Sequence, residues 1–260
     1  MGKLVSCVIV ECRKFVHSKV PLVTLLALIM VPFMGGFFMF ILKDPDLARS
    51  LGLISAKAQI VGLGTADWPT YYSLLTMAIS VGGLMVFGFV FSWIFGREYS
   101  EKTITDLLAL PVSRSTIALS KFVVAALWCL ALSAFVFLLA LLVGKLVAIP
   151  GWSVELLGEG TKTFLICAVL TILLSTPVAF FASAGRGYLA PLGFVVFTLV
   201  LAQLAPVIGY GQYFPWSVPS LLSGAVGNYL LGTASFLRLF VLSISGVVAT
   251  LLWWRYADQD

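Results

Sequence analysis

The stretch REYSEKTITDLLALPVSRSTIALSK, residues 97–121, is a charged island in a chain that is otherwise mostly apolar. Residues 68–96 on its N-terminal side and residues 122–144 on its C-terminal side carry no charge. Each run is long enough to cross a bilayer, which takes about 20 apolar residues. The sequence therefore predicts a short polar segment between two membrane spans, where it is placed to receive force from a soluble partner.

The composition places the rest of the chain in a membrane as well. Of the 260 residues, 61% are hydrophobic and only 10% are charged, and the mean hydropathy is +1.09. Soluble domains carry about 25% charged residues. We expect an all-α membrane protein with one domain, residues 1–260. Its six predicted spans lie at about 20–42, 72–95, 117–144, 163–185, 189–209 and 232–254, and Pro32 and Pro177 predict kinks in the first and fourth.

The basic residues predict which side of the membrane holds the chain ends. Six spans put both termini on one side. Ten basic residues fall on that side (Lys3, Arg13, Lys14, Lys19, Arg97, Lys102, Arg114, Lys121, Arg186, Arg255) and six fall opposite (Lys43, Arg49, Lys57, Lys145, Lys162, Arg238). This asymmetry favours cytoplasmic termini in a plasma membrane. Positive-inside bias and attraction to anionic lipid also explain the pI of 9.1, so we expect membrane lipid and no nucleic acid as a partner.

Residues 1–19 predict an amphipathic helix that lies in the inner membrane interface. Its apolar side chains recur at helical spacing (Leu4, Val5, Val8, Ile9, Cys12, Phe15, Val16), and its candidate functional residues are Glu11, Arg13 and Lys14. The alternative is a plain cytosolic extension of the first span.

Several kinds of chemistry are disfavoured by the sequence. The four cysteines have no paired spacing and His17 is the single histidine, so we expect no metal site. Residues 159–163 (EGTKT) lack the spacing of a phosphate loop. No Ser/His/Asp constellation is present, so the chain is not expected to be an enzyme by itself or to bind a cofactor. The predicted span interiors hold no ionisable side chain, which argues against an ion-coupled carrier.

The uncharged segment 210–233 is rich in glycine, proline and aromatic residues, including Tyr213, Phe214 and Trp216. Irregular backbone at membrane depth must be buried in protein or line a cavity. We therefore expect a short re-entrant or interfacial helix around residues 217–226 on the outer side; an ordinary external loop is the alternative. A second outer helix is possible within residues 43–67. Gln203, the strongest polar side chain in the spans, either bonds a neighbouring helix or contacts substrate.

The charged island itself predicts a cytoplasmic helix. Glu98, Lys102 and Asp106 are spaced four residues apart, a spacing that supports a helix across this segment. Pro111 ends that helix, and Ser113 or Ser115 is placed to cap the next one. The alternative is a connector that only satisfies the positive-inside bias.

Residues 96–124, GREYSEKTITDLLALPVSRSTIALSKFVV, resemble the signature loop of ABC-2-type permeases, the membrane subunits of ATP-binding-cassette exporters. The matching positions are Glu98, Tyr99, Thr103, Leu107, Leu110, Pro111, Ser113, Arg114 and Lys121. Lys102 stands where many members have glycine, so we expect a more helical turn there. VECRKFVHSK, residues 10–19, is similar to the first helix of that family, and YFPWSVP, residues 213–219, is similar to its bacitracin- and lantibiotic-type branch.

The resemblance implies a bacterial permease subunit that pairs with a second permease, identical or homologous, and with two ATPase subunits that hold ATP and magnesium. A coupling helix would receive the ATP-driven motion through Arg97, Glu98, Tyr99, Glu101, Lys102, Thr103, Asp106, Leu107, Leu110, Pro111 and Arg114. Glu98 is expected to face a basic rim on the ATPase. The cargo would be an amphipathic peptide or antibiotic, routed past Gln203, Tyr213, Phe214 and Trp216. The alternatives are sodium or small-molecule efflux, and a non-transport scaffold or sensor subunit.

Overall fold

A computed structural model describes residues 2–43, 65–108, 111–224 and 231–257, which form helices and turns with no strand among them. The described α-helices are α1 (Gly2–Val16), α2 (Val20–Lys43), α5 (Trp68–Ser100), α6 (Ile104–Leu108), α7 (Arg114–Leu146), α8 (Val154–Leu174), α9 (Thr176–Ala184), α10 (Leu189–Val207), α11 (Val218–Leu222) and α12 (Thr233–Tyr256). Two 3-10 helices, η2 (Gly211–Tyr213) and η3 (Pro215–Ser217), precede α11.

The described residues contain six helical segments that are long and apolar enough to span a membrane, with α8 and α9 together forming one of them. This confirms the predicted all-α class and the six spans. Large apolar side chains face outward on these helices: Leu138 is 62% exposed and Phe197 is also 62% exposed. An outer surface of this kind suits hydrocarbon, and the chain is a multi-pass membrane protein.

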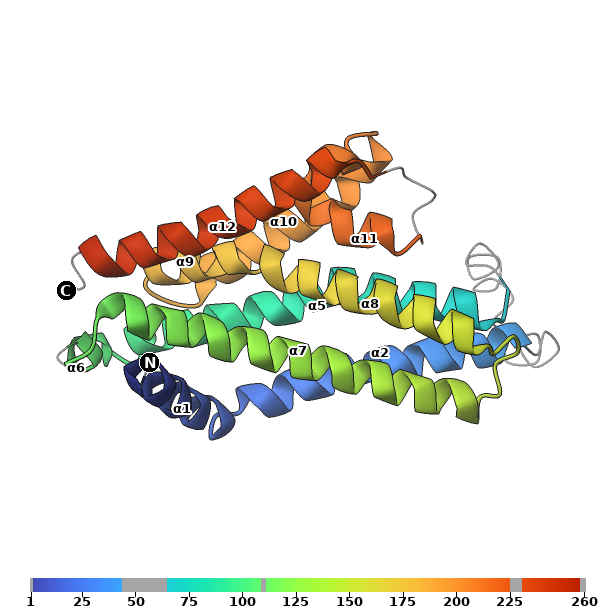
Figure 1. Cartoon of the computed structure of the whole chain (residues 1–260), viewed down its shortest axis with the longest axis horizontal. Helices are drawn as coiled ribbons and strands as arrows, with labels where there is room; N and C mark the ends of the chain where they lie inside the picture. Colours follow the sequence, from blue (N-terminus) through green and yellow to red (C-terminus); the bar gives the residue numbers. More distant parts are fainter. Residues whose placement is uncertain (1, 44–64, 109–110, 225–230, 258–260) are drawn as a thin grey trace.

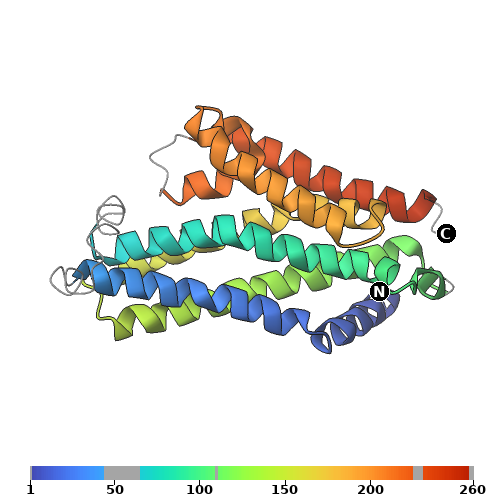
Figure 2. The ribbon, with the colours of Figure 1, turned by 180° about the vertical axis from the view of Figure 1, so that it is seen from behind.

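The helices lie in two groups that are visible in Figure 1. One group holds α1, α2, α5, α7 and α8, and the other holds α9, α10 and α12. Helix α5 packs against members of both, namely α2, α7, α8, α9 and α10. Figure 2 shows the same arrangement from behind, with the two described chain ends and α6 at one end of the molecule.

The two longest helices, α5 and α7, have 33 residues each and form the centre of the first group. Asp67 caps α5 by accepting a hydrogen bond from the Thr70 backbone amide at 2.9 Å. Ser113, one of the two predicted candidates, caps α7 in the same way by accepting from the Thr116 backbone amide. In the core, the Tyr71 hydroxyl contacts the carbonyl oxygens of Pro32 at 3.3 Å and Ala140 at 3.1 Å, which ties α5 to α2 and α7.

The fourth span breaks where Pro177 was expected to disturb it: α8 ends at Leu174 and α9 begins at Thr176. Proline has no backbone N–H and its ring crowds the carbonyl four residues earlier. That carbonyl, of Leu173, accepts the Thr176 hydroxyl at 2.8 Å instead. Helix α12 packs closely on the break, because a Cβ at Gly246 would come within 2.7 Å of the Pro177 nitrogen.

Three expectations about the outer end differ from the structure or fall outside it. Helix α8 begins at Val154, nine residues before the predicted span, because Ser153 caps it and accepts from the Leu156 amide at 3.1 Å. Helix α11 ends at Leu222 and is shorter than the predicted helix over 217–226; residues 225–230 lie outside the described residues. The possible helix within residues 43–67 also lies largely outside them.

Candidate functional site

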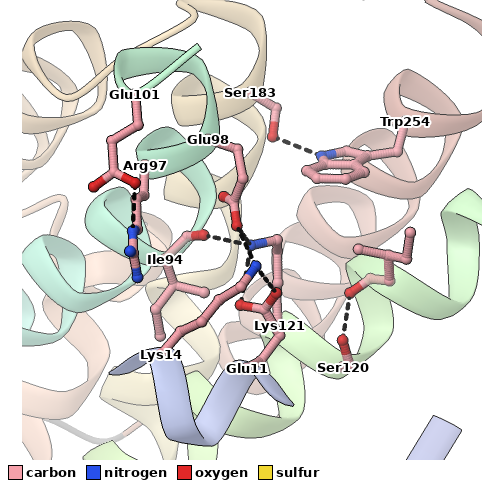
Figure 3. A network of polar contacts seen from close by, with 11 residues as sticks. Glu11, Lys14, Ile94, Arg97, Glu98, Glu101, Ser120, Lys121, Ser183 and Trp254 are labelled. Carbon is pink, nitrogen blue, oxygen red and sulfur yellow. Dashed lines mark hydrogen bonds and ion pairs between the residues drawn. The ribbon is translucent and has the colours of Figure 1, made fainter. Parts of the chain in front are cut away.

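Four charged side chains, two of them from the 97–121 segment, meet inside the helix bundle (Figure 3). The Lys121 ammonium on α7 lies 2.7 Å from Glu98 Oε1 on α5 and 3.2 Å from Glu11 Oε2 on α1. Lys14, also on α1, lies 3.2 Å from Glu11 Oε1 and 3.5 Å from Glu98 Oε1. This charge cluster, defined as Glu11, Lys14, Glu98 and Lys121, joins α5 and α7 to α1, which lies far from both in the sequence.

Lys121 is the centre of the charge cluster and its side chain is 0% exposed. It lies two turns after the start of α7, on the face that also buries Ile117, Ala118 and Ala125. Its third polar contact is the carbonyl oxygen of Ile94 at 3.0 Å, so three acceptors surround its three donors. The cluster is neutral overall, with two carboxylates and two ammonium groups, and neutrality is what makes burial tolerable.

The charge cluster also contacts the second group of helices. The Lys121 ammonium lies 5.9 Å from the centre of the Trp254 ring on α12. The Trp254 indole is 0% exposed and donates a hydrogen bond to the Ser183 hydroxyl on α9 at 2.9 Å. Side chains from α1, α5, α7, α9 and α12 therefore meet within one connected site.

Helix α5 ends at Ser100, two residues after Glu98, and the predicted helix through Lys102 is wrong. Lys102 has φ of 56°, a left-handed conformation in which glycine is favoured, and the Thr103 amide turns back to the Glu98 carbonyl oxygen at 2.9 Å. The i,i+4 pair that forms is Arg97 with Glu101, at 2.9 Å. The five-residue helix α6 follows the turn, with Ile104 packed into the core.

The predicted coupling residues divide into buried and accessible ones. The expectation that Glu98 faces a partner is wrong, because it is 2% exposed and pairs with Lys121. Arg97 and Tyr99 are half-buried, over Trp93 and against Trp254 respectively. Leu107 is half-buried, and the exposed residues are Glu101, Lys102, Thr103, Pro111 and Arg114. Leu110 and the side chain of Asp106 lie outside the described residues.

Helix α1 presents its predicted residues to different surroundings. Glu11 and Phe15 face the bundle and are buried, Lys14 is half-buried, and Arg13 is exposed. Val5 is 56% exposed and Ile9 is 49% exposed, so an apolar strip faces outward. That pattern is compatible with an interfacial helix, whose position in a membrane stays a prediction.

A cavity of about 510 Å³ opens between α1 and the start of α7, beside the charge cluster. Lys3, Cys7 and Glu11 line it from α1, Leu107 from α6 and Ile117 from α7. The Lys3 ammonium lies 3.5 Å from the Pro111 carbonyl oxygen at the rim of this cavity. The surface beside α6 is thus hollowed.

The predicted substrate-route residues lie on α10 and in the segment between α10 and α11, and they do not touch the charge cluster. The Trp216 indole is half-buried and donates to the carbonyl oxygen of Leu174, at the break in the fourth span. Phe214 packs beside Trp216, whereas Tyr213 is 52% exposed with the Arg238 guanidinium 5.0 Å from its ring centre. Gln203 is half-buried on α10. Their role in transport stays a prediction.

Sequence reasoning missed the role of Lys121, which it counted among the basic residues on the side of the termini. Two signals pointed to it: its match to the permease signature, and its position two turns inside an apolar helix. Trp254 carried no comparable signal, because an aromatic residue near a span end is common at membrane interfaces.

Comparison with known proteins gives the family of the chain. Residues 7–202 match the family model of ABC-2 family transporter proteins. The chain is 29% identical over 180 residues to the bacitracin transport permease protein BCRB of Bacillus licheniformis, covering 68% of this chain and 85% of that protein. The matched segment holds all four residues of the charge cluster, both long central helices and the turn that carries α6. The chain therefore belongs to the ABC-2 family of membrane transporter proteins.

Proposed function

We propose that this chain is the membrane permease of an ATP-driven exporter that removes bacitracin-like amphipathic peptides from a bacterial plasma membrane. The choice of cargo rests on the similarity to a bacitracin transport permease along 68% of the chain. Two ATPase subunits, which hold ATP and magnesium, and a second permease copy or homologue complete the transporter. Both termini and α6 face the cytoplasm.

The charge cluster gives a physical route for force from the ATPases. A partner that presses on α6 moves a segment joined at both ends to 33-residue helices, α5 and α7. Lys121 links those helices to each other and to α1 through Glu98 and Glu11, so the three move as one body. A buried pair of this kind resists separation because an isolated charge left in an apolar interior costs several kcal/mol.

The contact between Trp254 and Lys121 extends that route. Helix α12 packs on α9 and on the break between α8 and α9. Motion at the α6 end therefore reaches the outer half of the molecule through the interrupted fourth span. In this proposal the ATP-driven step tilts α5 and α7 against α9, α10 and α12 and opens a path for the cargo between permeases.

The test is protection against bacitracin in a sensitive bacterial host that expresses the chain together with its ATPase. We expect the minimum inhibitory concentration to rise severalfold. The same pair with the ATPase phosphate-loop lysine replaced serves as the control and should give no protection. Unchanged susceptibility to bacitracin and to other membrane-active peptides would refute the cargo, and raised tolerance to sodium or small drugs would indicate the other efflux functions.

Copurification tests the partner surface. Leu107→Asp places a carboxylate in the 510 Å³ cavity and should abolish ATPase copurification. Leu146→Asp makes the same change at the opposite end of α7, where the side chain is 85% exposed, and should leave it intact. Thermal unfolding of the purified permease checks that Leu107→Asp is folded. Normal copurification of that variant would place the ATPase elsewhere, and failure of the wild type to bind any ATPase would support a scaffold or sensor.

A further inference from the structure

A second cavity lies at the end of the molecule opposite α6, where α5, α8 and α11 meet. It has a volume of about 270 Å³, and six of its ten lining residues have polar side chains. Tyr72, Ser73 and Thr76 line it from α5, and Glu159 and Thr163 line it from α8. We call it the outer groove; it shares no residue with the charge cluster.

Tyr72 is held rigidly in the wall of the outer groove. Its ring is stacked on Phe137, with ring centres 6.2 Å apart and an angle of 21° between the planes. On another side it lies against Gly160, where an added Cβ would come within 2.7 Å of the ring. The side chain is 6% exposed, and its hydroxyl has no hydrogen-bond partner among the described residues. A buried polar group without a partner is costly, which suggests that a ligand completes the site.

Two hydroxyls in the groove are left as acceptors. Ser73 Oγ donates to the Ser223 carbonyl oxygen at 2.9 Å, and Thr76 Oγ1 donates to the Tyr72 carbonyl oxygen at 2.7 Å. A hydroxyl has one donor and two lone pairs. Since both hydroxyl hydrogens are already donated within the protein, the oxygen lone pairs of Ser73 and Thr76 remain to accept hydrogen bonds.

Glu159 supplies the charge. It is the charged side chain among the described residues that line the groove, it is exposed, and no ion pair holds it in the described part of the chain. A carboxylate beside acceptor hydroxyls attracts a cation that carries several N–H donors. A primary ammonium group has three such donors.

We propose that the outer groove binds a primary ammonium group of the amphipathic peptide cargo, with Glu159 as its counter-ion and Tyr72, Ser73 and Thr76 as its hydrogen-bond partners. This inference rests on the proposed export of peptides. The volume of about 270 Å³ is at or below the low end for ligand sites, so the groove takes one head group and leaves the apolar part of the peptide outside it.

Isothermal titration calorimetry on the purified permease tests the groove. The permease is placed in nanodiscs of phosphatidylcholine, a lipid without N–H donors, and titrated with bacitracin or with bacitracin whose primary amines are acetylated. We expect acetylation to weaken binding to the wild type about tenfold, in line with the strength of charge-assisted hydrogen bonds. Glu159→Gln should lose the same factor towards bacitracin and bind both forms equally.

Glu155→Gln is the matched control. Glu155 is an exposed acidic residue one turn earlier on α8 that does not line the groove, and its variant should behave as the wild type. Tyr72→Phe, which keeps the ring and removes the hydroxyl, should weaken binding of bacitracin without changing thermal stability.

Each other outcome overturns the inference in a distinguishable way. If Glu159→Gln still discriminates the two forms, the ammonium group is bound elsewhere. If phosphatidylethanolamine in the discs competes away the preference for the unmodified peptide, the ligand is a lipid head group. If the wild type binds unmodified and acetylated bacitracin equally while protection against bacitracin persists, the groove assignment fails and export stands. If bacitracin neither binds nor is resisted, both proposals fail.

Discussion

The Trp216 indole nitrogen lies 3.2 Å from the carbonyl oxygen of Leu174, the last residue of α8. Beyond this point the helical hydrogen-bond pattern is interrupted, since the Val178 amide bonds to Ser175 rather than to Leu174. The side chain of a connecting segment between α10 and α12 thus satisfies the backbone of the broken fourth span. Trp216, predicted to line a substrate route, has a structural partner.

Replacing Trp216 by phenylalanine should therefore destabilise the permease. The change removes the indole N–H donor and leaves the Leu174 carbonyl oxygen without that hydrogen bond in an apolar environment. The free energy of unfolding should fall by about 1–3 kcal/mol. Thermal unfolding of the purified protein should shift down by several degrees. Trp152→Phe, at a tryptophan that is 41% exposed, is the control and should have little effect. Equal shifts for the two variants would contradict this role of Trp216.

The charge cluster should behave as a unit in a double-mutant cycle. Lys121→Met leaves Lys14 as the one ammonium group for the two carboxylates Glu11 and Glu98 and should cost about 3–5 kcal/mol. Adding Glu98→Gln removes the uncompensated negative charge and should recover a large part of that loss. Unfolding free energies of the two single variants and the double variant give the coupling. Additive effects would show that Lys121 and Glu98 do not interact, and Lys102→Met is the exposed control.

Lys102 holds a left-handed conformation, with φ of 56°. Glycine adopts that conformation without steric cost, whereas for other residues it costs about 1–2 kcal/mol. Lys102→Gly should therefore raise the midpoint of thermal unfolding, and the β-branched Lys102→Val should lower it. Lys102→Asn separates charge from conformation, because asparagine tolerates the left-handed region. If Lys102→Gly lowered the midpoint of unfolding as much as Lys102→Val, the left-handed backbone at residue 102 would not be a source of strain.

Asp67 should stabilise α5 in a pH-dependent way. Burial acts to raise the pKa of its carboxyl group, but hydrogen bonds from the Thr65 hydroxyl and the Thr70 amide outweigh it and lower the pKa below the usual 3.8. Since the folded pKa is the lower one, the stabilisation is complete above pH 3.8 and is lost as the pH falls through the folded pKa. Asp67→Ala should cost about 1 kcal/mol near neutral pH.

The difference between wild type and Asp67→Ala should shrink below pH 3.8 in unfolding experiments. Asp67→Asn keeps an acceptor for the Thr70 amide and should retain most of the stability without the pH dependence. A difference that is constant down to the acid limit would assign the effect to something other than the carboxylate.

Orientation in the membrane can be read from one native thiol and one introduced thiol. Cys12 is exposed on α1, at the α6 end, and Leu146 is 85% exposed at the other end of α7. A membrane-impermeant maleimide on intact cells should label Leu146→Cys in a Cys12→Ser background and should not label wild-type Cys12. Opening the cells should expose Cys12. The reverse pattern would place the termini outside.

Local sequence signals predicted the features that depend on a single segment. Uncharged runs predicted the six spans, Pro177 predicted a kink where the fourth span is interrupted, and Ser113 was one of two predicted caps for α7. Each of these is decided by the chemistry of residues within a turn or two. The start of α8 was placed too late because Glu155, Glu159 and Lys162 resemble a loop in composition, although Ser153 caps a helix ahead of them.

The site was harder to predict because its contacts join distant segments. Glu11 and Lys121 are 110 residues apart, and nothing near either residue specifies the other. The spacing of Glu98, Lys102 and Asp106 was misleading, since pairing of Glu98 with the buried Lys121 outweighs a weak pair on a surface helix. The left-handed turn at Lys102 follows from that anchoring, because α5 must stop soon after Glu98 for the chain to reach α6 and α7.

The separation of Glu11 and Lys121 also bears on how the protein is made. The ribosome completes α1 long before α7 emerges, so during synthesis Glu11 has Lys14 as its partner on the same helix and not yet Lys121. Helix α1 becomes fixed to the bundle when the third span arrives and delivers the Lys121 ammonium. A tag fused ahead of Gly2 acts at the same step, and fusions at the two ends of the chain should differ in yield.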